Sequence, residues 1–363
     1  MSYLTFNSAE AVRWYDYYNL LDPNFQDIYF TPEYCEVYEK NGEGEAVLFI
    51  YQEGEKFVYY PFLKRKLSKL THLSLLKYYL NDFFDITTPY GYGGPLTNKP
   101  VDEQFLKNFN EQFRQYCDDM NIITEFVRFH PLMQNHSLYK EVKPACIRKT
   151  VYIDLTLDYS EIWINYDSKN RNRIKKSKTY DLEIRHRQTN DLDDFLTLYY
   201  STMNRNDADY YYYFSREFFN NTSYLLNEKL ELVEVLHKGV TIFSCFIMYS
   251  RNYLHYHLSG SNKDYQSYAS NNFLIDYLVQ WGKEKGIKYF HLGGGYSGDD
   301  SLYSFKKKFN KNGDLSFFIG RKIHNTEVYN KIVNECKYVK GDYFPQYRHP
   351  DLLSDDKLSQ TIN

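Results

Sequence analysis

Residues 230–261 read LELVEVLHKGVTIFSCFIMYSRNYLHYHLSGS, and this stretch decides the fold class. Two runs rich in β-branched and aromatic residues, Leu230–His237 and Val240–Tyr249, flank Lys238-Gly239, which predicts a β-hairpin. A third strand is predicted over Tyr253–Leu258 and ends at a Ser-Gly-Ser turn. The stretch therefore predicts an antiparallel meander as the centre of a domain.

A helix and a further strand complete this unit. From about Asn271 one helical stripe carries the apolar residues Phe273, Leu274, Tyr277, Leu278 and Trp281. Gly286 ends the predicted helix, and Ile287–Leu292 forms the next strand.

The same order of elements occurs earlier in the chain. A hairpin is predicted from Ala46–Tyr51 and Phe57–Leu63, a strand ends at Thr88, and a strand over Ile122–Phe129 follows a helix that carries Phe105, Phe109 and Phe113. Repetition at an offset of about 165–185 residues predicts one core built twice. We expect a mixed α/β fold (α+β, mixed sheets) with domains over 1–147 and 148–335. A charged tail over 336–363 is expected to pack loosely or to fray beyond about Ser354.

Composition excludes several classes of protein. With 363 residues, 43% hydrophobic and 25% charged, the chain is neither disordered nor a coiled coil. No apolar run approaches the roughly 20 residues of a spanning helix, and Met1–Trp14 shows no signal peptide. Five widely spaced cysteines predict neither a disulfide framework nor a standard zinc site, so we expect a cytoplasmic protein. The 40 tyrosines are typical of AT-rich codon usage or of aromatic platforms for sugars or bases.

Basic residues concentrate in residues 168–187, although the net charge is only −3. Arg171, Lys175 and Lys178 share one face of a predicted helix. A charge run of this kind is either a solvated helix face or an anion-binding surface.

A second basic cluster follows a glycine loop. Gly293, Gly294 and Gly295 come directly after a strand, and glycines there let backbone N–H groups approach a ligand closely. Lys306 lies on a helical turn whose buried side carries Phe305 and Phe309. Strand, loop and lysine helix predict a phosphate cradle, although the P-loop and dinucleotide-binding patterns are absent from the sequence.

Other candidate residues lie in the first domain and among the histidines. Tyr90 and Tyr92 interrupt the glycine-rich loop 89–95, near Asp85, and could stack on a sugar or base. The histidines His255, His257 and His291 fall on neighbouring strands, but without a Glu-x-x-His or cysteine pattern we predict no metal site. His291 is the better candidate for a general base.

Four motifs, in order, resemble the FemAB-like transferases and their GNAT-like relatives. They are Tyr29–Tyr34 (YFTPEY), Asp85–Pro95 (DITTPYGYGGP), Ser168–Lys176 (SKNRNRIKK) and Leu292–Gly294 followed by Leu302–Phe309 (LYSFKKKF). The resemblance covers about residues 25–320 and implies two tandem GNAT-like domains that transfer an acyl or aminoacyl group to an amine.

The resemblance also implies substrates. The acceptor would be a phosphorylated cell-envelope glycan or peptidoglycan precursor, with Lys306 on its phosphate. Arg171 and Tyr303 join Lys306 as expected substrate-binding residues, and contact with a membrane surface that holds a lipid-linked acceptor is expected. Direct attack of the amine would use backbone N–H groups near 258–260 for the oxyanion and His291, Asp85 or water for the proton.

The donor stays open between acyl-CoA and aminoacyl-tRNA, as a co-substrate rather than a tightly bound cofactor. Where GNAT enzymes carry a glycine-rich pyrophosphate loop, this chain has QSYASN over 266–271, so we assign donor binding to Gln266, Ser270 and Asn271. Asn310 also replaces the family's final glycine, and the long coiled-coil hairpin of many members is absent. A non-catalytic module that binds a phosphorylated glycan or RNA is the alternative.

Overall fold

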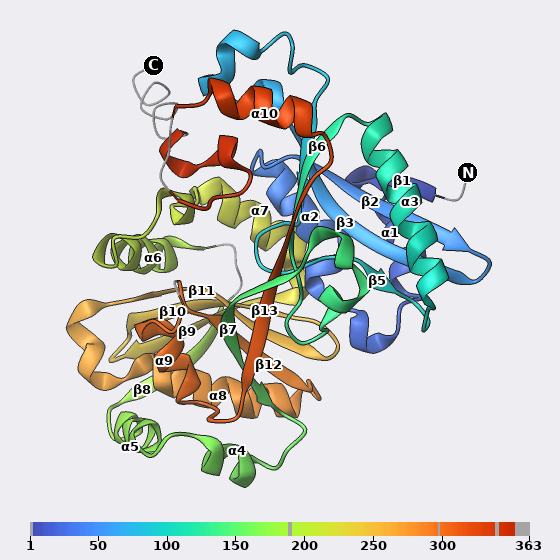
Figure 1. Ribbon diagram of the computed structural model, residues 1–363. Helices are drawn as coiled ribbons and strands as arrows, with labels where there is room; N and C mark the ends of the chain where they lie inside the picture. The colour runs from blue at the N-terminus through green and yellow to red at the C-terminus, as the bar shows by residue number, and fades with distance from the viewer. Residues whose placement is uncertain (1–2, 188–190, 297, 338–340, 353–363) are drawn as a thin grey trace. The chain divides into compact units, whose positions relative to one another are not determined.

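The computed structural model describes residues 3–187, 191–296, 298–337 and 341–352 (Figure 1). The chain divides into two compact units. Unit 1 comprises the described residues of 1–22, 29–146 and 318–363, and unit 2 those of 23–28 and 147–317. Among the described helices, none is long and apolar enough to cross a bilayer.

Unit 1 contains a mixed sheet with strand order β1-β2-β3-β4-β6-β13, and β5 pairs with β3. Among the described strands of this unit, β4 and β6 form the parallel pair. Its strands are β1 (Tyr3–Asn7), β2 (Glu45–Glu53), β3 (Lys56–Lys66), β4 (Phe84–Thr87), β5 (Leu96–Thr97), β6 (Ile122–Arg128) and the second part of β13 (Asp314–Ile323). Its helices are α1 (Ala11–Tyr18), α2 (Pro32–Lys40), α3 (Glu103–Asp119) and α10 (Thr326–Glu335).

Unit 2 contains the strand order β7-β12-β11-β10-β9-β8. Here β11 and β12 are the parallel pair. The strands are β7 (Ala145–Asp154), β8 (Leu182–Arg187), β9 (Leu230–His237), β10 (Val240–Tyr249), β11 (Tyr253–Ser261) and β12 (Tyr289–Gly294). The helices are α4 (Tyr159–Asn165), α5 (Ser168–Ser177), α6 (Asp193–Arg205), α7 (Arg216–Leu226), α8 (Ser270–Glu284) and α9 (Ser301–Lys307).

The predicted repetition is present in both units. The series β2-β3-β4-α3-β6 of unit 1 matches β9-β10-β11-α8-β12 of unit 2, and in each series the last two strands pair in parallel. Each unit takes its sixth strand from the chain segment that follows the repeated series of the other unit. After β6 the chain forms β7, which pairs with β12 of unit 2, and after β12 it forms β13, which pairs with β6 of unit 1.

This exchange changes the expected domain limits. The predicted boundary near residue 147 falls at the division between Cys146 and Ile147. Residues 318–335, which we expected in the second domain, belong to unit 1 because β13 and α10 pack there. Tyr347, in the expected tail, is fully buried in a cluster with Ile123 and Ile332, so the tail packs firmly at that point. The predicted fraying beyond Ser354 lies outside the described residues.

Each unit has its own core. In unit 1 the aromatic stripe of α3, Phe105, Phe109 and Phe113, is buried against β2 and β3, as its spacing predicted. In unit 2 one side of α8 packs on alternate residues of the sheet, among them Val233, Leu254, Phe290 and Leu292. Alternation in the strands therefore sends the residues between them, including His255 and His291, to the other face of the sheet.

Candidate active site

The parallel strands β11 and β12 stop pairing before they reach their carboxyl ends. Their pairing joins Tyr253–His255 to Tyr289–His291 and stops there in the described chain. Beyond that point β11 pairs only with β10, and β12 only with β7. In the pairing of β10 with β11, a β-bulge places two residues of β11, His257 and Leu258, opposite the single residue Phe246 of β10. Past His255, the edge of β11 that faces away from β10 therefore has no strand partner within the described residues.

Lys306 lies at the parted strands. Its Nζ donates a hydrogen bond to the Gly294 carbonyl oxygen of β12 at 2.7 Å and lies 6.0 Å from the ring centroid of Tyr256 in β11. The residue is only 8% exposed, and burial lowers the pKa of its ammonium to about 8. An ammonium has three N–H donors, and within the described residues one is hydrogen-bonded. Two N–H donors of this buried ammonium therefore have no hydrogen-bond partner among the described residues.

Tyr256 connects the lysine to the expected donor loop. Its hydroxyl lies 2.8 Å from Ser259 Oγ and donates to Asn271 Oδ1 at 3.3 Å. The structure thereby brings the predicted Asn271 into this group, and it places Ser270, which is buried, beside it as the first residue of α8. Gln266 is exposed in the preceding 3₁₀ segment Lys263–Tyr268 and stays apart from the lysine in the contacts of the described chain.

The glycine loop is already filled by a carboxylate. Asp300 caps α9 by accepting from the Tyr303 N–H at 2.8 Å, and its other oxygen accepts from the Tyr296 N–H at 2.6 Å. A Cβ on Gly295 would lie 2.2 Å from that carboxylate. The predicted phosphate cradle made of loop amides is therefore wrong, because Asp300 occupies it. Gly294 contributes its carbonyl oxygen instead, and Gly293 contributes the turn, at φ +73°.

Arg148 adds a second cation at the same place. Its Nη1 donates to the carbonyl oxygens of Gly295 and Tyr296, at 3.1 and 2.7 Å. Arg148 lowers the pKa of Lys306 further, whereas Asp300 opposes this effect. Two cations and one carboxylate leave a net positive charge at the parted strands.

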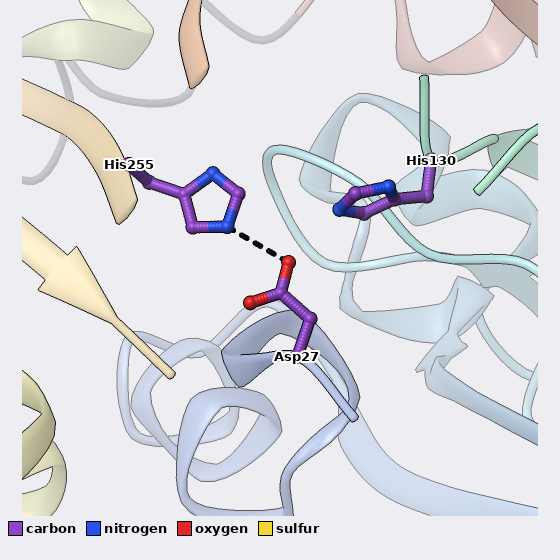
Figure 2. A group of neighbouring side chains, drawn as sticks. All are labelled: Asp27, His130 and His255. Carbon is purple, nitrogen blue, oxygen red and sulfur yellow. Dashed lines mark hydrogen bonds and ion pairs between the residues drawn. The ribbon is translucent and has the colours of Figure 1, made fainter. Parts of the chain in front are cut away.

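The histidines are placed more deeply than the sequence suggested. His255 and His291 are paired across β11 and β12, with ring centroids 5.8 Å apart, and both are buried. His291 Nε2 lies 2.9 Å from Thr150 Oγ1, and His255 Nε2 lies 2.8 Å from Asp27 Oδ2 (Figure 2). Burial and the neighbouring His255 lower the pKa of His257 to about 3, so its imidazole is neutral and a weak base. Because the ring of His291 is buried, it is not exposed to a substrate amine as a general base would be.

Asp85 is a structural residue, and its predicted catalytic role is wrong. The carboxylate is fully buried in unit 1 and accepts from Arg65 Nε at 2.6 Å and from Arg348 Nε at 2.5 Å. Burial alone would raise its pKa, but Arg348 and Arg65 outweigh burial and hold the pKa below its usual value. A carboxylate committed to two arginines cannot accept the proton of a substrate amine.

Arg171 also has a structural role. Its Nη1 donates to the carbonyl oxygens of Ile164 and Tyr166 at 3.2 and 2.5 Å, where α4 ends and its carbonyls lack helical partners. The predicted contact of Arg171 with substrate phosphate is therefore corrected to a helix cap.

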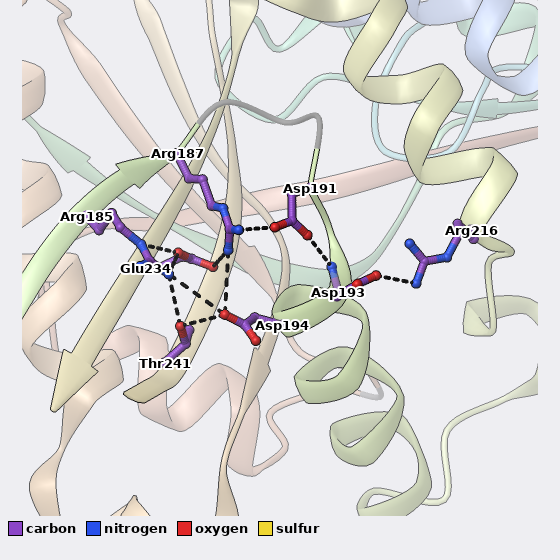
Figure 3. Close-up of polar contacts among 8 residues, drawn as sticks. All are labelled: Arg185, Arg187, Asp191, Asp193, Asp194, Arg216, Glu234 and Thr241. Carbon is purple, nitrogen blue, oxygen red and sulfur yellow. Dashed lines mark hydrogen bonds and ion pairs between the residues drawn. The ribbon is translucent and has the colours of Figure 1, made fainter. Parts of the chain in front are cut away.

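The end of the basic stretch is neutralised by carboxylates (Figure 3). Arg185 Nε donates to the fully buried Glu234 at 2.8 Å, and Arg187 pairs with Asp191 and Asp194. This network ties the edge strand β8 to β9 and α6. The lysines of α5, among them Lys175 and Lys176, are exposed.

The remaining predicted residues lie elsewhere. Tyr303 is buried and donates its hydroxyl to Asp314 Oδ1 at 2.8 Å, which makes it a support of α9. In unit 1, Tyr92 packs its ring on Tyr29, at 5.2 Å, and the Tyr90 carbonyl oxygen accepts from the Tyr34 hydroxyl at 2.7 Å. Both tyrosines are half-buried in this aromatic group.

Sequence reasoning missed Tyr256, Asp300 and Arg148. Tyr256 was taken as an ordinary strand residue, although strand alternation places it on the face opposite the two histidines. Asp300 stands three residues before Tyr303, which is the spacing of a helix cap and a usable signal. No local pattern marks Arg148, because its partners lie 147 and 148 residues away.

Comparison with known proteins agrees with this geometry. Residues 165–307 match the family model described as acetyltransferase (GNAT) domain. The crystal structure of FemX superposes with a TM-score of 0.65 at 14% identity, over 92% of this chain and 100% of that one. The C-terminal domain of a putative lysylphosphatidylglycerol synthetase from Agrobacterium fabrum gives 0.53 at 12% identity, over 88% and 94% of the two chains.

A conserved protein of unknown function from Bacteroides thetaiotaomicron gives a TM-score of 0.51 at 12% identity, over 88% of this chain and 98% of that one. No curated protein sequence matches the chain. The matched segment contains β11, β12 and Lys306, and Lys306 is its last residue but one. The chain thus has a mixed α/β fold that resembles FemX over most of its length, and its residues 165–307 match the model of the acetyltransferase (GNAT) domain.

Proposed function

We propose that this protein is an N-acyltransferase that moves an acyl or aminoacyl group to the amine of a phosphorylated cell-envelope glycan or peptidoglycan precursor. One observation carries the proposal: the buried ammonium of Lys306 stands at the parted parallel strands, and one of its three N–H donors is hydrogen-bonded within the described residues. Burying an ammonium is costly, and an anionic group of the substrate would offset that cost.

The reaction needs little acid–base chemistry from the protein. The neutral amine attacks the donor carbonyl, a carbon–nitrogen bond forms, and the ester or thioester bond to the donor breaks. The bulge of β11 supplies backbone N–H groups for the oxyanion. Because Asp85 and His291 are buried, the proton of the amine passes to water. The contribution of the protein is then the placement of two charged substrates.

The donor side favours the end of a nucleic acid over acyl-CoA. The N-cap residue of α8 is Ala269, at φ +53°, and the loop before the helix lacks the glycines that would admit a pyrophosphate to the helix amides. Directly before it, Tyr268 stacks on Tyr180 with ring centroids 4.4 Å apart, and Lys176 lies 5.9 Å from the Tyr180 ring. Aromatic faces beside cations are the usual means of holding unpaired bases.

Thermal shift distinguishes the donors. We expect charged tRNA to stabilise the protein and acetyl-CoA to leave it unchanged, and Tyr268→Ala to weaken tRNA binding by about 10-fold, since a stacked base contributes about 1–3 kcal/mol. Tyr224→Ala, which alters a tyrosine that is 81% exposed on α7, is the matched control.

The other outcomes of this experiment are informative. Stabilisation by acetyl-CoA alone would reverse the donor assignment without affecting the acceptor role of Lys306. Stabilisation by neither donor, combined with binding of a phosphorylated glycan, would favour the non-catalytic module.

A further inference from the structure

A short segment of unit 1 exposes large apolar side chains that its own core leaves outside. In residues 66–79, which include the 3₁₀ segment Thr71–Leu76, Leu75 is 93% exposed, Tyr78 is 95% exposed and Tyr79 is 40% exposed. The inward side chains Leu67, Leu70 and Leu73 follow a spacing of three and are buried with Ile332 of α10. Leu75 and Tyr78 repeat that spacing on the outer side.

The charge around these side chains is positive. Between residues 64 and 82 the chain carries five basic residues and one acidic residue, Asp82. Two of the basic residues, Lys64 and Arg65, are paired with carboxylates. Lys66, Lys69 and Lys77 form no ion pair within the described part of the chain.

The packed helix α10 adds one more cation. Lys331 lies with its Nζ 3.7 Å from the centroid of the Tyr79 ring. The two glutamates of this helix, Glu327 and Glu335, stand near its two ends. The apolar side chains are thus bordered by ammonium groups.

We infer that residues 66–79, together with Lys331, dock the protein on an anionic phospholipid bilayer. Leucine and tyrosine side chains at the tip of a lysine-rich segment suit the interface between head groups and acyl chains. Unpaired lysines attract the anionic leaflet, and their contribution falls as salt increases. Protein–protein interfaces are depleted in lysine, so Lys66, Lys69 and Lys77 beside the apolar side chains favour a bilayer over a protein partner. Docking would bring the chain to lipid-linked molecules, but it does not depend on the transfer reaction.

Co-sedimentation of the full chain with lipid vesicles tests this inference. We expect binding to phosphatidylcholine vesicles that contain phosphatidylglycerol, and little binding to phosphatidylcholine alone. The double variant Leu75→Glu/Tyr78→Glu is expected to reduce binding at least 10-fold. Lys69→Gln/Lys77→Gln should reduce binding and remove most of its salt dependence.

Matched controls separate the patch from general surface effects. Ile164→Glu and Tyr224→Glu alter apolar side chains that are 67% and 81% exposed in unit 2, and both should bind vesicles like the unaltered protein. Circular dichroism checks that every variant is folded. Equal binding by the double variant and the unaltered protein, or no binding to either vesicle, would overturn the inference. So would a dimer in solution that the double variant converts to a monomer, because the patch would then cover a second copy.

Discussion

Replacement of Lys306 by methionine is expected to lower kcat/KM for a phosphorylated acceptor by about 100-fold, chiefly through a higher KM. Methionine keeps the length and apolar stem of the side chain and removes the ammonium that donates to Gly294. A buried hydrogen bond to a charged group is worth about 1.5–3 kcal/mol, and loss of the charge pair with a phosphate adds to that. Steady-state kinetics with varied acceptor concentration measures the effect.

The matched control is Lys308→Met. Lys308 stands two residues after Lys306, directly after the end of α9, and is exposed, so its loss should change kcat/KM by less than about twofold. An unchanged KM in Lys306→Met would remove the phosphate-binding role, whichever donor the enzyme uses.

The pH dependence gives a second readout of Lys306. Burial lowers its pKa to about 8, so the ammonium that binds the anion is present below that pH and is lost above it. We therefore expect the KM of the acceptor to rise as the pH passes about 8. The inflection should be absent from Lys306→Met and present in Lys308→Met.

Stability separates binding from a merely structural role. The folded pKa of Lys306 lies below the unfolded value, so the folded protein holds this proton less tightly than the unfolded chain does. The lowering from 10.5 to about 8 corresponds to about 3 kcal/mol of unfavourable burial below pH 8, relieved as the pH rises toward 10.5. Lys306→Met should therefore be at least as stable as the unaltered protein at pH 7. If Lys306 were needed for the structure instead, its replacement would lower the free energy of unfolding.

The repeated core could be predicted because its signals are local. Alternation in Leu230–His237 and the helical stripe of Phe105, Phe109 and Phe113 fix which face of each element is buried. The exchange of β7 and β13 carries no such signal, since a strand pattern does not state its partner. This is why residues 318–335 were expected in the wrong unit.

Site residues whose surroundings come from neighbours in the sequence could be predicted. Residues whose role depends on partners far away in the sequence could not. Lys306 stood out because Phe305 and Phe309 anchor its helix, and the structure places those rings 5.5 Å apart. Arg171 looked like a phosphate ligand because nothing in the sequence states that α4 ends beside it. Asp85 was taken for a catalytic carboxylate because its partner Arg348 lies 263 residues away.

Asp85→Asn is expected to lower the free energy of unfolding of unit 1 by about 3–5 kcal/mol, because it leaves the guanidinium groups of Arg65 and Arg348 close together without their counter-charge. Glu45→Gln is the matched control. It breaks the pair with Lys64, in which the glutamate side chain is 58% exposed, and should cost no more than about 1 kcal/mol.

Urea unfolding followed by Trp14 fluorescence measures this loss in unit 1 alone. Trp14 is fully buried there, and the other two tryptophans, Trp163 and Trp281, belong to unit 2 and can be replaced by phenylalanine in every variant compared. The folded pKa of Asp85 lies below its unfolded value, so its stabilisation is present at neutral pH and is lost as the pH falls through the folded pKa. Asp85→Asn should lack this acid-dependent part, while folded enzyme keeps its kcat. A variant that unfolds like the unaltered protein but loses its kcat would instead restore Asp85 to the chemistry.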